Sequence, residues 1–343
     1  MPAGTVHFLV PAGFDDPLRV SGGNMFDRRL SAGLSAAGWR VRLAEVAVGS
    51  ESAARVALAD VPDGGIALID GLVAGRAPAA IEGSATRVRI VVLAHMVSEA
   101  FPGADPQVID GEHRALCAAA AVIVTSPWTR SELVGRELVP LERITVATPG
   151  ADRTEAAAGT RGGRALLCVG VVTAHKGQDI LIEALAGLRA RPTWRCAIVG
   201  SATVDPAFAA RLGARAEDLG IADRITMTGV LGAADLDAAY RAADLLVAPS
   251  RTESYGMAIA DALGRGIPVI ASRVGGIPST VAPGRSAVLV PPEPGALGTA
   301  LDRWMTDPAL RSRLKDAALR GRGGLPRWSD TVDRVAETLA GFP

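Results

Sequence analysis

The stretch "DLLVAPSRTESYGMAIADALGRGIPVIAS", residues 244–272, carries a strand, a loop, a helix and a second strand in direct succession. The apolar run that ends at Ser250 is continuous rather than alternating, which is typical of a parallel strand buried on both faces. The helix is predicted to begin near Gly256 and to end at the glycines before Pro268. Two acids, Glu253 and Asp261, lie eight positions apart in this otherwise apolar stretch.

The start of this helix predicts an anion-binding site. The backbone N–H groups of Tyr255, Gly256 and Met257 lie at a helix N-terminus, where they are well suited to bind phosphate. Glu253 precedes them in the loop, and Asp261 lies more than a turn further along the helix. Carboxylates accept hydrogen bonds from vicinal hydroxyls, so the pattern suits a sugar–diphosphate–ribose ligand. The alternative is an acid near the helix dipole together with an exposed helical aspartate.

The same kind of apolar run recurs along the whole chain, with amphipathic helical patterns between many of the runs. This alternation predicts an α/β protein with doubly wound parallel sheets. The predicted strands are 6–10, 41–46, 66–70, 89–95, 121–126 and 144–150 in the first half, and 165–172, 196–200, 225–229, 245–250, 268–272 and 287–291 in the second.

A small, polar, glycine-rich segment at 151–163 interrupts the strand pattern and reads as a linker. We therefore expect an N-terminal Rossmann-like domain over 1–155 and a C-terminal one over 156–325. Two such domains would face a cleft with the carboxyl ends of their strands, where ligands of open parallel sheets bind. Residues 326–343 form a final helix, for which packing against the N-terminal domain is an open alternative.

The composition of the chain excludes some classes of binding partner. The chain has 343 residues, with 36 Lys and Arg against 36 Asp and Glu, so its formal net charge is zero. A balanced charge gives no electrostatic footprint for nucleic acid, and the longest apolar stretch, 115–124, is too short to span a membrane. The three cysteines form no C-x-x-C pair, which favours reduced core cysteines. We expect a cytoplasmic protein without stable membrane insertion, with peripheral contact to the inner membrane left open.

Several segments together resemble family 4 retaining glycosyltransferases, whose fold is GT-B. That family shows the pattern PS-x-x-E-G/S-F/Y-G with a second acid eight positions after the first, then a G-x-P-V-I-A strand and a G-G turn. The matching positions here are Pro249, Ser250, Glu253, Tyr255, Gly256, Gly266, Pro268, Val269, Gly275 and Gly276. The segments "LLCVGVVTAHKGQDILIEALAGL" (166–188), "VSGGNMFDRRLSAGLSAAGWRV" (20–41) and "VATPGAD" (146–152) resemble further parts of the family pattern.

The resemblance implies roles for residues of the C-terminal half. Lys176, one of only two lysines in the chain, would bind the donor diphosphate as a point charge. Glu253 would hold hexose hydroxyls and Asp261 the ribose hydroxyls. The helix start at 255–257 would bind phosphate.

For the N-terminal half, the resemblance implies that Gly22 and Gly23 form a loop that approaches the phosphates or the sugar. Glycine suits a place where the backbone must come close to a ligand. His95, at the end of the strand "RIVVLAH", would lie beside the donor sugar near the reacting carbon. With Lys176 and Glu253 it makes up the predicted catalytic set. An ordinary glycine turn and a structural histidine at the strand end are the alternatives.

Three positions depart from the family pattern. Val171 stands where the family usually has an arginine, so one cation on the diphosphate is missing or comes from elsewhere, with Arg251 and Arg273 as unranked candidates. The second acid is Asp261 rather than Glu, so its ribose contact is expected to be longer or water-bridged. Ser279 stands where the family often has an acid.

The expected activity is transfer of a hexose of glucose or mannose type from a UDP- or GDP-sugar to a small-molecule, glycan or lipid acceptor, with retention at the anomeric carbon. No metal site and no cofactor are predicted. The D-x-D sequence at 235–237 opens a predicted helix, where acids are favoured by the dipole. A non-catalytic nucleotide-sugar-binding protein and a nucleotide-sugar epimerase stay open as alternatives.

Overall fold

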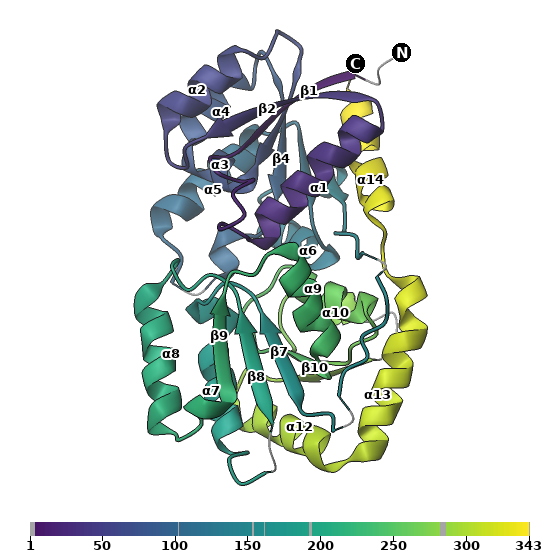
Figure 1. Ribbon diagram of the computed structural model, residues 1–343. Coiled ribbons are helices and arrows are strands. Elements are labelled where there is room, and N and C mark those ends of the chain that lie inside the picture. The colour runs from purple at the N-terminus through teal and green to yellow at the C-terminus, as the bar shows by residue number, and fades with distance from the viewer. Residues whose placement is uncertain are drawn as a thin grey trace. The chain divides into compact units, whose positions relative to one another are not determined.

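The computed structural model describes residues 4–342 except 102, 153, 161, 192–193 and 282–285. The chain divides into two compact units, one made of residues 1–150 with 326–343 and the other of residues 151–325. Each unit contains one six-stranded sheet in which every strand pairing is parallel, with helices on its faces (Figure 1). The predicted α/β fold with two doubly wound sheets is confirmed.

The first unit has the sheet order β2-β1-β3-β4-β5-β6. Its strands are β1 (Gly4–Pro11), β2 (Trp39–Val46), β3 (Ile66–Asp70), β4 (Arg89–Ala94), β5 (Ala121–Val124) and β6 (Ile144–Val146). Its helices are α1 (Gly22–Ala36), α2 (Glu51–Ala59), α3 (Gly71–Arg76), α4 (Pro78–Ser84), α5 (Pro106–Ala118), α6 (Pro127–Gly135) and α14 (Trp328–Ala340).

Both faces of this sheet are buried because alternate strand residues are apolar on both sides. Along β1, Phe8 packs in the core beneath α1 and α14, whereas its neighbour Leu9 packs in the core beneath α2 to α6. The C-terminal helix α14 is fixed to α1 partly by an edge-to-face contact of Trp328 with Phe26, with 5.6 Å between ring centroids. The last helix therefore forms part of the N-terminal unit.

The second unit has the sheet order β12-β11-β10-β7-β8-β9. Its strands are β7 (Ala165–Val169), β8 (Arg195–Val199), β9 (Ile225–Gly229), β10 (Leu245–Ala248), β11 (Val269–Ser272) and β12 (Ala287–Val290). Its helices are α7 (Gln178–Ala186), α8 (Pro206–Asp218), α9 (Ala233–Ala242), α10 (Met257–Gly264), α11 (Ile277–Val281), α12 (Pro294–Thr306) and α13 (Pro308–Gly321).

Counted from its own first strand, the second sheet has the order 3-2-1-4-5-6 of the Rossmann fold. The order reverses between the neighbouring strands β7 and β10, so the connections leave their carboxyl ends in opposite directions. Such a switch point is where open parallel sheets bind ligands. In the core of this unit, Trp194 is fully buried and donates its ring N–H to the Leu188 carbonyl at 3.0 Å.

The described residues of the 151–163 segment form no helix or strand, and the boundary predicted after residue 155 falls inside that segment. The segment is held to the second unit by Asp244, whose carboxylate accepts hydrogen bonds from the backbone and the hydroxyl of Thr160. Of the cysteines, Cys168 and Cys196 are buried as expected, but Cys117 is exposed, because it lies on the outer side of α5.

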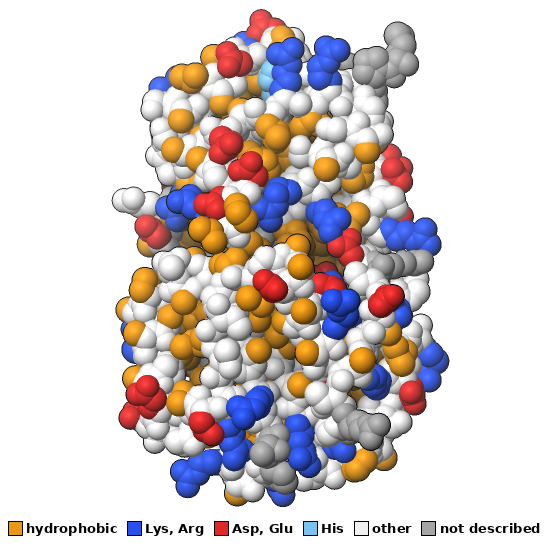
Figure 2. All heavy atoms as spheres, in the orientation of Figure 1, with side chains coloured by type: hydrophobic (Ala, Val, Ile, Leu, Met, Phe, Trp, Pro, Cys, Tyr) orange, Lys and Arg blue, Asp and Glu red, His pale blue; other side chains and the backbone are white. Residues whose placement is uncertain are grey.

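The surface matches the neutral composition. Figure 2 shows basic and acidic side chains interspersed over the displayed face, with apolar side chains between them. Among the described residues, no helix has both the length and the apolarity needed to cross a bilayer.

Candidate active site

In the second unit, the loops after β7 and β10 bring together two predicted functional side chains from positions far apart in the sequence. The loop after β7 leads into a short 3₁₀ turn, Ala174–Lys176, and the loop after β10 carries Glu253. The Lys176 ammonium Nζ lies 2.6 Å from Glu253 Oε2, and the two side chains are 23% and 17% exposed. The switch point of the sheet thus carries a partly buried ion pair. A ligand phosphate that binds Lys176 would share it with Glu253.

Two glycines allow this approach. Gly177 has a φ of 70°, and a side chain there would place its Cβ 2.1 Å from the Pro249 carbonyl oxygen. Gly275 has a φ of 53°, and its Cβ would lie 2.0 Å from the Glu253 carbonyl oxygen, which also accepts a hydrogen bond from the N–H of Gly276. Both positions combine a left-handed backbone with direct backbone contact, so only glycine fits them.

The helix after Glu253 begins close to where the sequence predicted. Helix α10 has Gly256 as its N-cap, in the left-handed region with a φ of 96°. Among the described residues, the backbone N–H groups of Gly256 and Met257 have no hydrogen-bond partner. The Tyr255 ring is buried beneath this turn, and Thr280 donates its hydroxyl hydrogen bond to the Tyr255 carbonyl. These groups give the N-terminus of α10 the features of an anion site.

Asp261 lies on α10, one turn beyond these N–H groups. Burial raises the pKa of Tyr255 and of Tyr240, and the nearby Asp261 charge raises both further. The carboxylate is therefore close to both phenol rings. The structure places Asp261 on the helix as predicted, and its contact with a ribose stays a prediction.

The second acid of the D-x-D sequence, Asp237, forms ion pairs with two arginines. Asp237 lies on α9 and binds Arg265 at 3.0 Å and Arg241 at 3.2 Å. The Arg265 guanidinium in turn stacks over Tyr240 at 4.7 Å. Asp237 therefore contributes to the attachment of α9 to α10, in accordance with its assignment to a helix.

Of the two arginines considered as a replacement for the missing cation, Arg251 is committed to another acid. Its guanidinium binds both carboxylate oxygens of Asp179, at 2.7 and 2.6 Å, and also donates to the Ala174 carbonyl. It lines a surface cavity of about 520 Å³ together with Asp179, Phe208 and Arg211. Among the described residues, the side chain of Arg273 makes one long contact, at 3.5 Å with the Leu289 carbonyl. Of the two, Arg273 is thus the less constrained.

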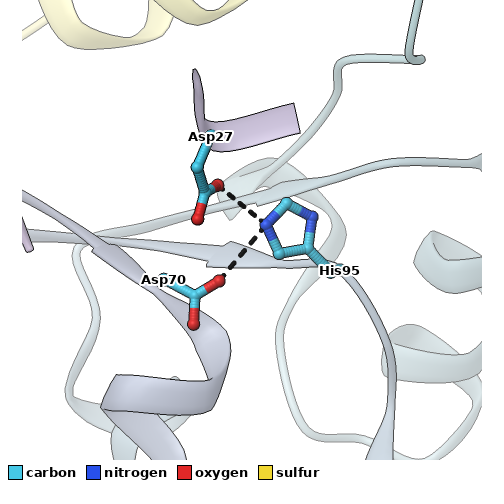
Figure 3. Close-up of side chains that lie close together, drawn as sticks. All are labelled: Asp27, Asp70 and His95. Carbon is cyan, nitrogen blue, oxygen red and sulfur yellow. Dashed lines mark hydrogen bonds and ion pairs between the residues drawn. The ribbon is translucent and has the colours of Figure 1, made fainter. Parts of the chain in front are cut away.

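In the first unit, the predicted residue His95 contacts two aspartates for which no role was predicted. His95 follows β4, Asp70 ends β3, and Asp27 lies in the second turn of α1 (Figure 3). The ring nitrogen Nε2 of His95 lies 2.9 Å from Asp27 Oδ1 and 3.3 Å from Asp70 Oδ2. Both aspartates are buried, and His95 is 16% exposed.

The prediction that Gly22 and Gly23 form a loop is wrong. They are the first residues of α1, because the Ser21 hydroxyl caps this helix by accepting a hydrogen bond from the Asn24 N–H. Gly23 nevertheless lies against the His95 ring, since a Cβ there would be 3.3 Å from His95 Cδ2. Any approach of these glycines to a ligand would thus be that of a helix N-terminus.

The three side chains share charge. Burial raises the pKa of Asp27 to about 6 against the opposing effect of His95. Burial would lower the pKa of His95, but the Asp27 carboxylate, with Asp70, outweighs it and raises the pKa to about 10. The ligand atoms of the three residues lie within 4.8 Å of one another, the one such group among the described residues that could hold a metal ion. The observed separations are hydrogen-bond distances, and we interpret the cluster as hydrogen-bonded.

Two signals in the sequence could have revealed these aspartates. Asp70 ends the predicted strand "IALID", at the carboxyl edge that carries His95 one strand further on. Asp27 lies directly after the buried Phe26 and three positions before the buried Leu30, so its helical position points toward the core. A buried acid on an apolar helix face needs a partner, and the sequence alone did not identify it.

Residues 155–320 match the model of the family described as glycosyl transferases group 1. A D-inositol 3-phosphate glycosyltransferase of Segniliparus rotundus is 37% identical over 172 residues, which cover 48% of this chain and 37% of that protein. Its namesake in Thermobifida fusca is 30% identical over 246 residues, covering 66% and 56%. The chain thus spans about half the length of these curated relatives or less.

Two solved structures share the fold over almost the full chain. Sucrose-phosphate synthase from Thermosynechococcus elongatus has a TM-score of 0.80 at 22% identity, covering 97% of this chain and 98% of that one. Anabaena Alr3699/HepE in complex with UDP-glucose has a TM-score of 0.79 at 18% identity, covering 98% and 99%. Residues 155–320 therefore match the group 1 glycosyltransferases, and the chain as a whole has the GT-B fold.

Proposed function

We propose that the protein is a retaining glycosyltransferase that moves a hexose of glucose or mannose type from a UDP- or GDP-sugar to an acceptor, without a metal ion or a cofactor. The observation that carries the proposal is the Lys176–Glu253 pair at the switch point of the second sheet, beside the N-terminus of α10. A cation, a carboxylate and helix N–H groups together suit a ligand that joins a diphosphate to a polyol.

In this proposal, the bond between the anomeric carbon and the diphosphate oxygen breaks, and the acceptor oxygen bonds to that carbon on the same face. The acceptor proton passes to a donor phosphate oxygen. Lys176 and the N–H groups of Gly256 and Met257 would stabilise the negative charge that grows on the leaving diphosphate. Glu253 would accept hydrogen bonds from sugar hydroxyls and so orient the donor.

The first acceptor to test follows from the relatives. Proteins named D-inositol 3-phosphate glycosyltransferase are 30% and 37% identical to parts of this chain. We therefore include D-inositol 3-phosphate among the acceptors, next to simple glycans and lipid acceptors. Asp261 is proposed to bind the donor ribose, and His95 to contact the donor sugar.

The chain offers a matched control for the site, because its two lysines differ in setting. Lys176 pairs with Glu253, whereas Lys315 donates to the Ala158 carbonyl at 3.1 Å on the exposed surface of α13. Lys176→Ala should lower release of nucleoside diphosphate from a labelled donor about 10- to 100-fold, the effect of losing one charge-assisted hydrogen bond. Lys315→Ala should leave it unchanged.

The outcomes separate the alternatives. Equal turnover in the two lysine variants would contradict the site assignment. A lack of nucleoside diphosphate release with every UDP- and GDP-hexose and acceptor would contradict the transferase. Recovery of an epimerised nucleotide sugar would indicate the epimerase instead. Binding of a nucleotide sugar without any turnover would indicate a binding protein.

A further inference from the structure

In the cluster of the first unit, the Asp27 and Asp70 carboxylates both contact the same edge of the His95 ring. Carboxylate oxygens accept hydrogen bonds, so a ring nitrogen Nε2 that lies 2.9 Å from Asp27 and 3.3 Å from Asp70 carries a proton shared between them. The other ring nitrogen, Nδ1, points away from both acids (Figure 3) and has no hydrogen-bond partner among the described residues. The ring is therefore held on one edge and available on the other.

The ring is also fixed by packing. Phe26, next to Asp27 on α1, contacts it edge to face, with 5.2 Å between ring centroids. Gly23 in the first turn of α1 lies against Cδ2, and Thr125, just after β5, donates to the His95 backbone carbonyl at 3.5 Å. The two contacts from α1 thus leave the ring little freedom to turn, and the Thr125 hydrogen bond holds the His95 backbone.

The charge balance decides the protonation state. Among the described residues, no lysine or arginine pairs with Asp27 or Asp70, and these two are the charged groups that face the ring. A neutral imidazole would leave two buried carboxylates uncompensated, which is costly in a low-dielectric interior. Asp70 Oδ1 also accepts hydrogen bonds from the Leu72 and Val73 N–H groups at the start of α3, whereas Asp27 Oδ2 has no hydrogen-bond partner within the described chain. The Asp27 charge therefore depends most on a protonated His95. The raised pKa values of His95 and Asp27 agree with this balance.

We propose that Asp27 and Asp70 are positioning residues that keep His95 as a fixed imidazolium, whose Nδ1–H donates a charged hydrogen bond to an oxygen of the bound donor. The ligand assignment rests on the proposed function, but the protonation state does not. In this role His95 supplies a positive charge and a donor, and it does not take the acceptor proton as a general base.

The protonation state can be measured without turnover. We would record the ring-nitrogen signals of the protein labelled with ¹⁵N-histidine between about pH 6 and about pH 9, where an ordinary histidine loses its charge. The chain has four histidines, and His95→Gln identifies the signal. Burial lowers the pKa of His7 and of His175, the latter to about 4, so both stay neutral as internal references.

We expect His95 to show two protonated nitrogens throughout this range in the wild type. Asp27→Asn and Asp70→Asn keep a hydrogen-bond acceptor but remove a charge, so each should make the ring titrate at lower pH. The effect should be larger for Asp27, whose contact is shorter. A neutral ring in the wild type at about pH 7.5, an unchanged titration in both variants, or a signal that shifts when a chelator is added would overturn the proposal.

Kinetics test the consequence. With a working donor, wild-type kcat should be nearly independent of pH between about pH 6 and about pH 9, since the charge on His95 does not change. In Asp27→Asn, kcat should fall about tenfold or more by about pH 8 and recover toward pH 6, with a smaller change in donor KM. A kcat that rises with pH in the variant would identify a general base and contradict the proposal.

Two controls protect the interpretation. Asp110→Asn removes a charge from the exposed face of α5, where the acid contacts Arg114 at 3.8 Å, and should leave both readouts unchanged. Unchanged His7 and His175 signals show that a variant is folded. If no donor supports transfer, the proposed function fails, whereas the nitrogen signals still decide the state of His95.

Discussion

The loop contact between Gly177 and Pro249 gives the sharpest test of how the second unit builds its site. In Gly177→Ala, the new Cβ would lie 2.1 Å from the Pro249 carbonyl oxygen, whereas ordinary contact begins at 3.4 Å. The two loops would have to separate by about 1.3 Å, the difference between these distances. Lys176 and Glu253, one on each loop, now lie 2.6 Å apart, so this shift would break their hydrogen bond.

The cost in stability has two parts. A non-glycine residue at a φ of 70° costs about 1–2 kcal/mol. Forcing an extra carbon into a packed contact costs about 1–3 kcal/mol. The total of about 2–5 kcal/mol corresponds to a fall in Tm of at least about 4 °C for a unit of this size. Because the displaced loops carry Lys176 and Glu253, the affinity for nucleoside diphosphate should fall as well.

A matched glycine lies at the other end of the same helix. Gly187 follows α7 with a φ of −60°, and a Cβ there would meet only the Ala184 carbonyl oxygen, at 3.4 Å. Gly187→Ala should therefore be neutral or slightly stabilising, by up to about 1 kcal/mol. Thermal unfolding and isothermal titration with UDP and GDP would be measured on both variants. A Gly177→Ala protein with the Tm and the nucleotide affinity of Gly187→Ala would refute the reasoning.

Three further predictions concern the acids. Glu253→Gln frees Lys176 from its ion pair, so calorimetry should show that the variant binds free UDP or GDP at least as tightly as the wild type does. Hexose transfer should fall about 10- to 100-fold, whereas weaker nucleotide binding would contradict this prediction. Asp261→Glu should retain transfer whereas Glu253→Asp should not, since only the first restores the family residue; equal loss in steady-state assays would disprove the asymmetry. Burial raises the pKa of Glu112 from an ordinary 4.5 to about 7, although hydrogen bonds from Ser98 oppose the shift. The protonated acid therefore contributes to the free energy of unfolding below pH 4.5, and this stabilisation is lost as the pH rises through 7. In denaturant titrations, Glu112→Gln should therefore gain about 3 kcal/mol relative to the wild type between about pH 4.5 and about pH 8, and a constant difference would count against a buried, protonated Glu112.

Most of the fold could be read from the sequence because its signals are local. Each apolar run, such as "ALLCV" at 165–169, is continuous rather than alternating. This pattern indicates a strand that is buried on both faces and therefore parallel to its neighbours. The helix after Glu253 was placed to within a residue because a glycine before it and glycines after it mark its ends. Gly22 and Gly23 were misassigned because the cap that starts α1 is a serine hydroxyl one residue earlier.

The residue types of the candidate site could be predicted from the sequence, whereas their distances could not. The sequence by itself determined which residue types stand at the strand ends: a rare lysine in "AHKG", an acid before a glycine helix start, and a histidine after "RIVVLA". It could not determine the distances, since Lys176 and Glu253 are 77 positions apart and meet only because β7 and β10 are neighbours at the point where the sheet order reverses.

The contact of two aspartates with His95 could not be predicted from the sequence. Asp27 lies on α1, Asp70 ends β3 and His95 follows β4, and each is unremarkable in its own segment. Packing α1 onto the sheet buries two carboxylates against one ring nitrogen, which only the tertiary structure decides. Local pattern thus fixes which chemical groups the chain carries to a sheet edge. The order of the strands and the packing of the helices decide which of those groups share a proton, because protonation depends on burial and on charges a few ångströms away.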